Sequence, residues 1–556
     1  MKTRMIFVRN SGRTKALFAY FTAQCHLAKN LQNTANFYIR NLRTGLTKEP
    51  SERTDNENEV IRITMQSIDQ YNQNRTLAFH KAVKRAGKKF SSMPSLAVSS
   101  YVLTNLRKQD RLMQYPDKEH WMPSYEQLNA ILYWSGNQDY FALPSQANQQ
   151  ILRKVIKSWM GYFAALAVYR EHPERFLGMP KAPGYKRSTC STLPFTNQII
   201  KLTPAGGKNH LSFPGGGLTL CIGKDTDCVD LVKVEVKPYG DGFHVLITYK
   251  ADVANPIVPK DPERILGLDC GIDNFMTGTT NFPCIPFIID GKWIKSGNRY
   301  FNKRRAELLA SLTRGSDSIH SVKNSRRLDV MSRKRSDKMR DYFYKASYWI
   351  VRYCRQHDIE VVVCGGNKGQ KQNLDLGNSN NQNFIQIPTQ TFFRILQQVA
   401  AGAGIPVIFR EESYTSKASL IDGDPIPVYE KGCAADHHFS GKRIKRGLYQ
   451  TSHGIQINAD VNGAGNIIRK EYPHAFDPVT DWSYLYKTVS VITRDDLCHG
   501  DTHGRKRITA KPGKHRSYNR KHNHNIHWDR KLEYMELFGV TKKSKDTYKK
   551  QPVQAA

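Results

Sequence analysis

The chain has 556 residues, and its 84 Lys and Arg residues outnumber its 49 Asp and Glu residues, which gives a formal net charge of +35. An excess of this size is more than solubility requires and favours a polyanionic partner, above all nucleic acid. Because 39% of the residues are hydrophobic and 10% are aromatic, a wholly disordered basic chain is excluded, and the length predicts roughly two to four domains.

The ten cysteines are scattered and form no closely spaced C-x-x-C pair, which is typical of reduced thiols rather than of a disulfide framework. The segment Met1–Arg9 is basic but lacks the apolar core of a signal peptide. No stretch reaches the ~18 apolar residues of a membrane helix. We therefore expect a cytoplasmic protein with no membrane partner; the oligomeric state is left open.

The first half of the chain changes from a helical to a strand-like pattern. Met5–Val8 is a short strand-like run, and apolar residues then recur at helical spacing from about Ser11 to His172. After the Pro- and Gly-rich segment Gly178–Lys186, several short runs alternate with period two, as half-buried strands do. This predicts a helical region followed by a β-rich domain that ends near Pro262.

The second half predicts an α/β domain. Three strand patterns come first, and Asp290–Gly291 reads as a hairpin turn between strands. A basic helical stretch over Tyr300–Arg355 is followed by strand, helix, strand and a last helix that starts near Asp460, with Asn458 or Asp460 as its cap. Three strands followed by helix, strand, helix, strand and helix is the order of an RNase H-like fold.

Three carboxylate-bearing segments stand out within this predicted domain. Asp269 ends an apolar strand, where a carboxylate is costly unless it is paired or bound to metal, although it also suits a turn. Asp460 lies among small residues that permit close helix–sheet packing, although it also suits a helix cap. Glu411 and Glu412 follow a further strand. Brought together, such carboxylates bind paired Mg²⁺ ions and support phosphodiester cleavage.

These segments resemble the RuvC-like nuclease of the TnpB family and its relatives, the type V CRISPR effectors. The resemblance rests on Gly267–Asn274, on Tyr414–Lys417 and on Asn458–Ile467, and it extends upstream through Pro180–Lys186, Asp290–Lys292 and Asn302–Arg305. It implies a multi-domain α+β protein in which a helical recognition region and a β-rich wedge (oligonucleotide-binding) domain precede an RNase H-like (RuvC) α/β nuclease domain. The implied activity is RNA-guided cleavage of double-stranded DNA with a guide RNA and two Mg²⁺ ions, for which Mn²⁺ substitutes.

The predicted boundaries follow from the patterns and from this resemblance. They are the first wedge strand at 1–10, the helical recognition region at 11–175, the wedge domain at 176–262, the RuvC-like domain at 263–484 with an insert at 417–457, and a basic extension at 485–556.

The chain departs from the family pattern at the second catalytic carboxylate. The family carries a Glu at the end of the fourth strand, whereas this strand ends at Cys364–Gly365. We expect the next strand to supply the missing ligand from Glu411 or Glu412, and favour Glu411 because it continues the alternation of Val407 and Phe409. The predicted metal ligands are therefore Asp269, Glu411 and Asp460.

A second departure concerns zinc. Relatives often have two C-x-x-C pairs after the Tyr-Thr-Ser segment, but here Ala418 stands where a first Cys is expected. Between Ser416 and Asp460 only Cys433 and three histidines could serve, so we expect no zinc.

Basic residues of the long helical stretch are predicted to contact nucleic-acid phosphate, the alternative being a solvated charged face. They are Lys303, Arg304, Arg305, Arg326, Arg327, Arg333, Lys334 and Arg335. Two other functions stay open at this point: an RNA-guided DNA-binding protein with little or no cleavage, and a transposase-like strand-transfer enzyme.

Overall fold

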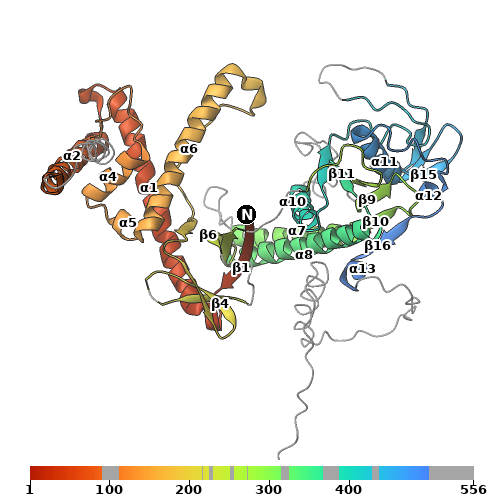
Figure 1. The fold of residues 1–556 in the computed structure, drawn as a ribbon, viewed down its shortest axis with the longest axis horizontal. Coiled ribbons are helices and arrows are strands. Elements are labelled where there is room, and N and C mark those ends of the chain that lie inside the picture. The colour runs from red at the N-terminus through yellow and green to blue at the C-terminus, as the bar shows by residue number, and fades with distance from the viewer. Residues whose placement is uncertain are drawn as a thin grey trace, which may run out of the picture. The chain divides into compact units, whose positions relative to one another are not determined.

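The computed structural model describes residues 1–90, 112–215, 217–223, 230–250, 256–271, 273–314, 325–366, 387–428 and 437–499. The chain divides into two compact units, Met1–Asp252 and Val253–Ala556 (Figure 1). Both units combine helices and strands, as the sequence predicts. Within the described ranges, no helix is both long and apolar enough to span a membrane.

The helical part of the first unit is built on long amphipathic helices. Its helices are α1 (Lys15–Thr47), α2 (Asp55–Phe90), α4 (Tyr125–Trp134), α5 (Gln138–Phe141) and α6 (Ser145–Glu171), with short 3₁₀ turns at Gly12–Thr14, Pro50–Glu52 and Pro173–Arg175. On α1, buried residues such as Leu17, Phe21 and Cys25 recur every four positions, which gives one apolar face. The fully buried Trp159 of α6 donates its indole N–H to Asn36 Oδ1 of α1 at 3.0 Å and so fixes the two helices together.

Two antiparallel sheets complete the first unit. Their strands are β1 (Lys2–Arg9), β2 (Leu193–Thr196), β3 (Lys201–Ala205), β4 (Lys208–Ser212), β5 (Thr219–Gly223), β6 (Leu231–Tyr239) and β7 (Gly242–Tyr249). The orders are β1-β7-β6-β2 and β3-β4-β5. β1 pairs with β7 along its whole length, so the first residues of the chain form one sheet with strands that come much later in the sequence.

The second unit is built around a six-stranded mixed sheet in the order β12-β11-β8-β9-β10-β16. Its strands are β8 (Ile265–Asp269), β9 (Asn274–Thr280), β10 (Phe287–Asp290), β11 (Val361–Gly365), β12 (Val407–Arg410) and β16 (Ser490–Ile492). β8, β9 and β10 are antiparallel neighbours, whereas β11 runs parallel to β8, β12 parallel to β11, and β16 parallel to β10. The carboxyl ends of β8, β11 and β12 therefore meet at one edge.

Helices cover both faces of this sheet (Figure 1). They are α7 (Lys292–Thr313), α8 (Arg326–Gln356), α10 (Thr389–Ala401), α11 (Ala459–Glu471), α12 (Ser483–Tyr486) and α13 (Arg494–His499), and a small sheet of β13 (Lys442–Lys445), β14 (Leu448–Gln450) and β15 (Gln456–Asn458) precedes α11. One core joins α8 and α10 to one side of the sheet. A separate core joins α11 to the other side.

The structure differs from the sequence prediction at two places in this unit. The hairpin turn predicted at Asp290–Gly291 is wrong: Asp290 Oδ1 accepts from the Lys292 N–H at 2.9 Å, and Gly291 starts α7. The sheet also extends beyond the predicted boundary at 484, because β16 pairs with β10 and α13 packs against α8. The rest of the predicted basic extension, from residue 500 on, lies outside the described residues.

Candidate active site

Asp269 ends β8 and faces α11. Ile265 packs into the core that contains α11, and side chains at two-residue steps share a face, so Gly267 and Asp269 lie on the same side. A Cβ atom at Gly267 would lie 2.3 Å from the backbone oxygen of Ala464, and one at Gly463 would lie 2.9 Å from Asp269 Oδ2. These two glycines therefore allow the first turns of α11 to approach the strand and its carboxylate, as the small residues predict.

Asp460 lies in the first turn of α11 and is held by neighbours on both sides. Asn458 is the N-cap, because its Oδ1 accepts from the N–H groups of Asp460 at 2.9 Å and Val461 at 3.3 Å. This leaves the carboxylate of Asp460 available for other contacts. Asn274 Nδ2 donates to Asp460 Oδ2 at 2.6 Å, and an Arg443 nitrogen lies 3.8 Å from Oδ1.

Of the two glutamates after β12, Glu412 is the one beside Asp269. Its charge is close enough to raise the pKa of Asp269, second only to the effect of burial. Its side chain also lies over the end of β11, where a Cβ atom at Gly365 would be 2.9 Å from Glu412 Cγ and 3.1 Å from Oε1. Glu412 thus lies beside the end of β11, a strand that itself contains no carboxylate.

The structure places Glu411 away from Asp269, because the alternation that favours Glu411 follows the other face of the sheet. Val407 and Phe409 do pack into a core, but it is the core of α8 and α10. Ile408 packs against the core that contains α11, on the side of the carboxylates. Glu412 continues the two-residue steps from Ile408, whereas Glu411 does not.

Glu411 is used in a structural ion pair instead. Its Oε2 pairs with Lys470 Nζ, whose side chain is only 8% exposed, and Lys470 also donates to the backbone oxygen of Ser413 at 2.8 Å. The other Glu411 oxygen accepts from the Ser413 N–H at 2.6 Å. These contacts fasten the segment after β12 to the end of α11, and so help to position Glu412.

The electrostatics of the site favour binding of cations. Burial, followed by the negative charges of Glu412 and Asp460, raises the pKa of Asp269 from 3.8 to about 8. The Cys270 N–H and the Arg443 guanidinium oppose this only in part. Three carboxylates that repel one another in a partly buried place require added positive charge before all of them can ionise.

The hairpin of β13 and β14 supplies cations that sequence reasoning missed. Arg443 lies near Asp460, and Arg446 pairs with Asp273, which also accepts from Lys295 Nζ at 2.6 Å. Hydrogen bonding from Lys295, above all, lowers the pKa of Asp273. The signal in the sequence is the basic run Lys442–Arg446 just before Gly447, a left-handed turn glycine with φ of 80°.

The residues present fit Mg²⁺ in their chemistry. Carboxylate oxygens are the ligands that hard divalent cations prefer, and burial together with the negative charges of Glu412 and Asp460 raises the pKa of Asp269, which a bound cation would oppose. In the described ranges, no three His, Cys, Asp or Glu side chains already surround a common metal position. Asp269, Glu412 and Asp460 would therefore have to close together around the ions. Cys433 of the zinc prediction lies outside the described residues.

The predicted phosphate-binding residues divide into exposed and packed side chains. Arg335 donates to Asn298 Oδ1 at 2.8 Å and stacks over Phe301 at 4.9 Å, while Arg333, 12% exposed, bonds Asp337 at 3.1 Å. Arg304 pairs with Glu307 on α7. The exposed members are Lys303, Arg305, Arg326, Arg327 and Lys334. Packing thus gives Arg333 and Arg335 structural contacts, while those five residues face solvent.

Comparison with known proteins connects this site to nucleic-acid enzymes. Residues 247–371 match the family model of the OrfB_IS605 probable transposases, and residues 390–467 match that of the Cas12f1-like TNB domain. The two matches include Asp269, Glu412 and Asp460. No curated protein matches the sequence.

Several solved structures are similar in general arrangement. A Cas12f1–sgRNA–target DNA complex shares 12% identity over 84% of this chain and 98% of that chain, with a TM-score of 0.41. The mini-RNA-guided endonuclease CRISPR-Cas phi3 shares 11% identity over 63% and 86%, with a TM-score of 0.35. CasPhi-2 (Cas12j) bound to crRNA and phosphorothioate-DNA shares 10% identity over 70% and 96%, with a TM-score of 0.33.

At these TM-scores no residue role is carried over from the solved structures. The two family models, however, match in chain order and cover the strands and helix that hold the carboxylates. They agree with the resemblance of the sequence motifs, so over residues 247–371 and 390–467 the chain is similar to the TnpB-type probable transposases and to the Cas12f1-like effectors.

Proposed function

We propose that the protein is an RNA-guided DNA endonuclease whose active site is formed by Asp269, Glu412 and Asp460. The observation that carries the proposal is the convergence of these carboxylates at one edge of a mixed sheet, within the family-matched residues. The sheet supports an RNase H-like assignment, since three antiparallel strands are extended by two parallel ones and α11 crosses the strand that ends in Asp269.

The three carboxylates would hold two Mg²⁺ ions. When bound, such ions supply an activated water and stabilise the leaving 3′ oxygen of a phosphodiester. The protein's own part is to orient the ligands. Asn274 and the N-cap Asn458 hold Asp460, while the Glu411–Lys470 pair fixes the segment that carries Glu412.

Arg443 is the cation suited to the scissile phosphate. It comes from the β13–β14 hairpin, its side chain is 46% exposed, and it lies 3.8 Å from the Asp460 carboxylate. With the carboxylates neutralised, its guanidinium would be released to bind a non-bridging phosphate oxygen, for which its planar donor geometry is well matched. Its role would be to position the phosphate and to stabilise its developing charge.

Guide RNA and target double-stranded DNA are the proposed partners. The net charge of +35 and the exposed cations of α7 and α8 suit a polyphosphate, and the similar structures hold sgRNA or crRNA together with DNA. Base pairing would supply the specificity while the protein reads a short flanking motif and the shape of the heteroduplex. Such an enzyme would work in the cytoplasm of a prokaryotic cell, at the nucleoid when bound to DNA.

The test is to express the chain with its native flanking locus, sequence the RNA that copurifies and assay cleavage of a matched duplex with Mg²⁺. We expect a discrete RNA with a constant scaffold and a variable end, and cutting that Asp269→Asn abolishes without loss of the RNA. Heterogeneous, salt-labile RNA would contradict guided cleavage. Since the matched family model describes probable transposases, joined donor–target products would instead favour strand transfer.

A further inference from the structure

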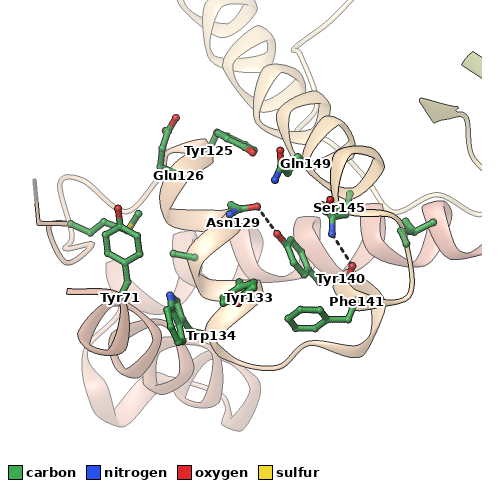
Figure 2. A pocket seen from close by; sticks show the side chains of 14 residues that line it. Tyr71, Tyr125, Glu126, Asn129, Tyr133, Trp134, Tyr140, Phe141, Ser145 and Gln149 are labelled. Carbon is green, nitrogen blue, oxygen red and sulfur yellow. Dashed lines mark hydrogen bonds between the residues drawn. The ribbon is translucent and has the colours of Figure 1, made fainter. Parts of the chain in front are cut away.

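The helical part of the first unit contains an aromatic pocket distinct from the nuclease site. It encloses about 520 Å³ between α2, α4, α5 and α6. Figure 2 shows Tyr125 and Gln149 on one side, Asn129 and Tyr140 in the middle, and Tyr133, Trp134 and Phe141 on the other side. This volume lies within the range of small-ligand sites.

Two of the pocket's rings are exposed although they are large and apolar. Tyr133 is 47% exposed and Phe141 is 55% exposed, and their ring centroids lie 5.5 Å apart at an angle of 51°. The ring centroid of the buried Tyr140 lies 5.2 Å from that of Phe141, so the two rings pack against each other. Rigidly supported rings with exposed faces offer stacking surfaces for a flat aromatic ligand.

The pocket also contains the buried amide of Asn148, whose oxygen has no hydrogen-bond partner among the described residues. Asn148 is 2% exposed, and its Nδ2 donates to the backbone oxygen of Tyr140 at 3.0 Å. Its Oδ1 accepts no hydrogen bond from any described residue. A buried acceptor left unpaired is costly, so a ligand that brings an N–H donor would gain from meeting it.

The rim carries one strong cation and one anion. The Arg153 guanidinium lies 3.8 Å from the ring centroid of Tyr125 and is exposed on α6. Glu126, also exposed, adds a second acceptor for N–H groups. The site therefore combines aromatic faces and hydrogen-bond acceptors with a cation beside Tyr125 that can reach a phosphate at the edge.

We propose that this pocket binds one unpaired nucleobase with an exocyclic amino group, from single-stranded nucleic acid. The base would stack face-on against Phe141 with its edge against the tilted ring of Tyr133, its amino group would donate to Asn148 Oδ1, and its phosphate would contact Arg153. Nucleic acid is the ligand that suits the charge of the protein, because a net charge of +35 favours a polyphosphate over an uncharged aromatic ligand. The proposal does not depend on cleavage.

The experiment uses the full chain purified free of nucleic acid, and a six-nucleotide single strand with one central 2-aminopurine, tested as RNA and as DNA. Stacking quenches 2-aminopurine, so fluorescence reports occupancy of the pocket. The variants are Phe141→Leu, which keeps an apolar side chain but removes the ring, and Tyr133→Leu. Met160→Ala is the matched control, because Met160 is a 63% exposed apolar residue of α6 that does not line the pocket.

We expect quenching in the wild type, a loss of affinity of about ten-fold in each Leu variant, and no change with Met160→Ala. Replacing 2-aminopurine by purine, which lacks the amino group, should weaken competition, and the stronger of the RNA and DNA signals identifies the source. Wild-type affinity in both Leu variants would overturn the proposal. Self-association of the protein that Phe141→Leu abolishes, without quenching, would also overturn it and assign the patch to a second copy.

The same preparations separate this result from the proposed function. Asp269→Asn should bind the 2-aminopurine strand as the wild type does, because Asp269 lies in the other unit. If the Leu variants fail to bind while duplex cleavage is absent in every variant, the pocket stands and the nuclease proposal fails.

Discussion

The choice between Glu411 and Glu412 gives the sharpest test of the candidate active site. Glu412→Gln removes a negative charge that raises the pKa of Asp269, while keeping the size of the side chain. A nearby like charge disfavours ionisation of a carboxyl group, so we expect the pKa of Asp269 to fall below about 8 in the metal-free variant. The variant should also lose one anionic ligand and cleave DNA at least about 100-fold more slowly.

Glu411→Gln is the matched control, since it makes the same chemical change one residue earlier. It breaks the pair with Lys470, in which Glu411 is 40% exposed and Lys470 is 8% exposed. Lys470 keeps its bond to the Ser413 backbone oxygen, so the loss of stability should be about 1 kcal/mol. Cleavage should fall far less than in Glu412→Gln, because Lys470 still binds the Ser413 backbone oxygen and so keeps part of the support for the segment that carries Glu412.

The assay is single-turnover cleavage of a matched duplex by protein loaded with its own RNA, at saturating Mg²⁺, with thermal melting of each variant beside it. Strong loss in Glu412→Gln with near-normal Glu411→Gln supports the geometry. The reverse pattern would refute the assignment of faces on β12 and restore the original choice of Glu411. Unchanged cleavage in both would remove the second carboxylate from the mechanism and favour a binding protein.

Three further changes probe the same site. Arg443→Ala should slow cleavage about 10–100-fold, whereas Arg446→Ala, which removes a 78% exposed charge from the same hairpin, should have little effect; a larger loss with Arg446→Ala would contradict the phosphate-binding role. Asn458→Ala should cost about 1 kcal/mol in unfolding experiments and slow cleavage, because α11 loses its N-cap beside Asp460, and an unchanged melting temperature would argue against that cap. Because the folded pKa of Asp269 lies above its unfolded value, its contribution to stability is present below about pH 4 and is lost as the pH rises through about 8. Asp269→Asn should therefore stabilise the metal-free protein by about 1–3 kcal/mol at about pH 9 but not at about pH 4, and a difference in melting temperature that does not change with pH would oppose this.

Local patterns in the sequence are enough to select Asp269 and Asp460 as members of the candidate site. Asp269 was predicted from an apolar run that ends in a carboxylate, and Asp460 from the small residues around it. Each prediction uses only residues within a few sequence positions of the carboxylate. The structure places both residues at one edge of the sheet.

Other features of the second unit depend on contacts between residues that are not neighbours in the sequence pattern, and local patterns do not predict them. Arg443 lies near Asp460 only because three short strands set the register of a hairpin. β16 has three residues, too few for alternation to show, and becomes a strand only by pairing with β10. Arg333 and Arg335 look like their basic neighbours in the sequence, yet Asp337 and Asn298 bind them.

The position of Glu412 shows why the alternation along β12 reduces the candidates to Glu411 and Glu412 but does not decide between them. Alternation separates the two faces of β12 but does not say which face lies beside Asp269 and Asp460. That is decided by α11, which lies on the side of Ile408. The same packing explains the sequence of β11. Since Glu412 lies over Gly365, and a Cβ atom there would be 2.9 Å from Glu412 Cγ, a side chain at the end of β11 and the carboxylate after β12 would compete for one space. Gly365 at the end of β11 therefore leaves open the space that the Glu412 side chain occupies.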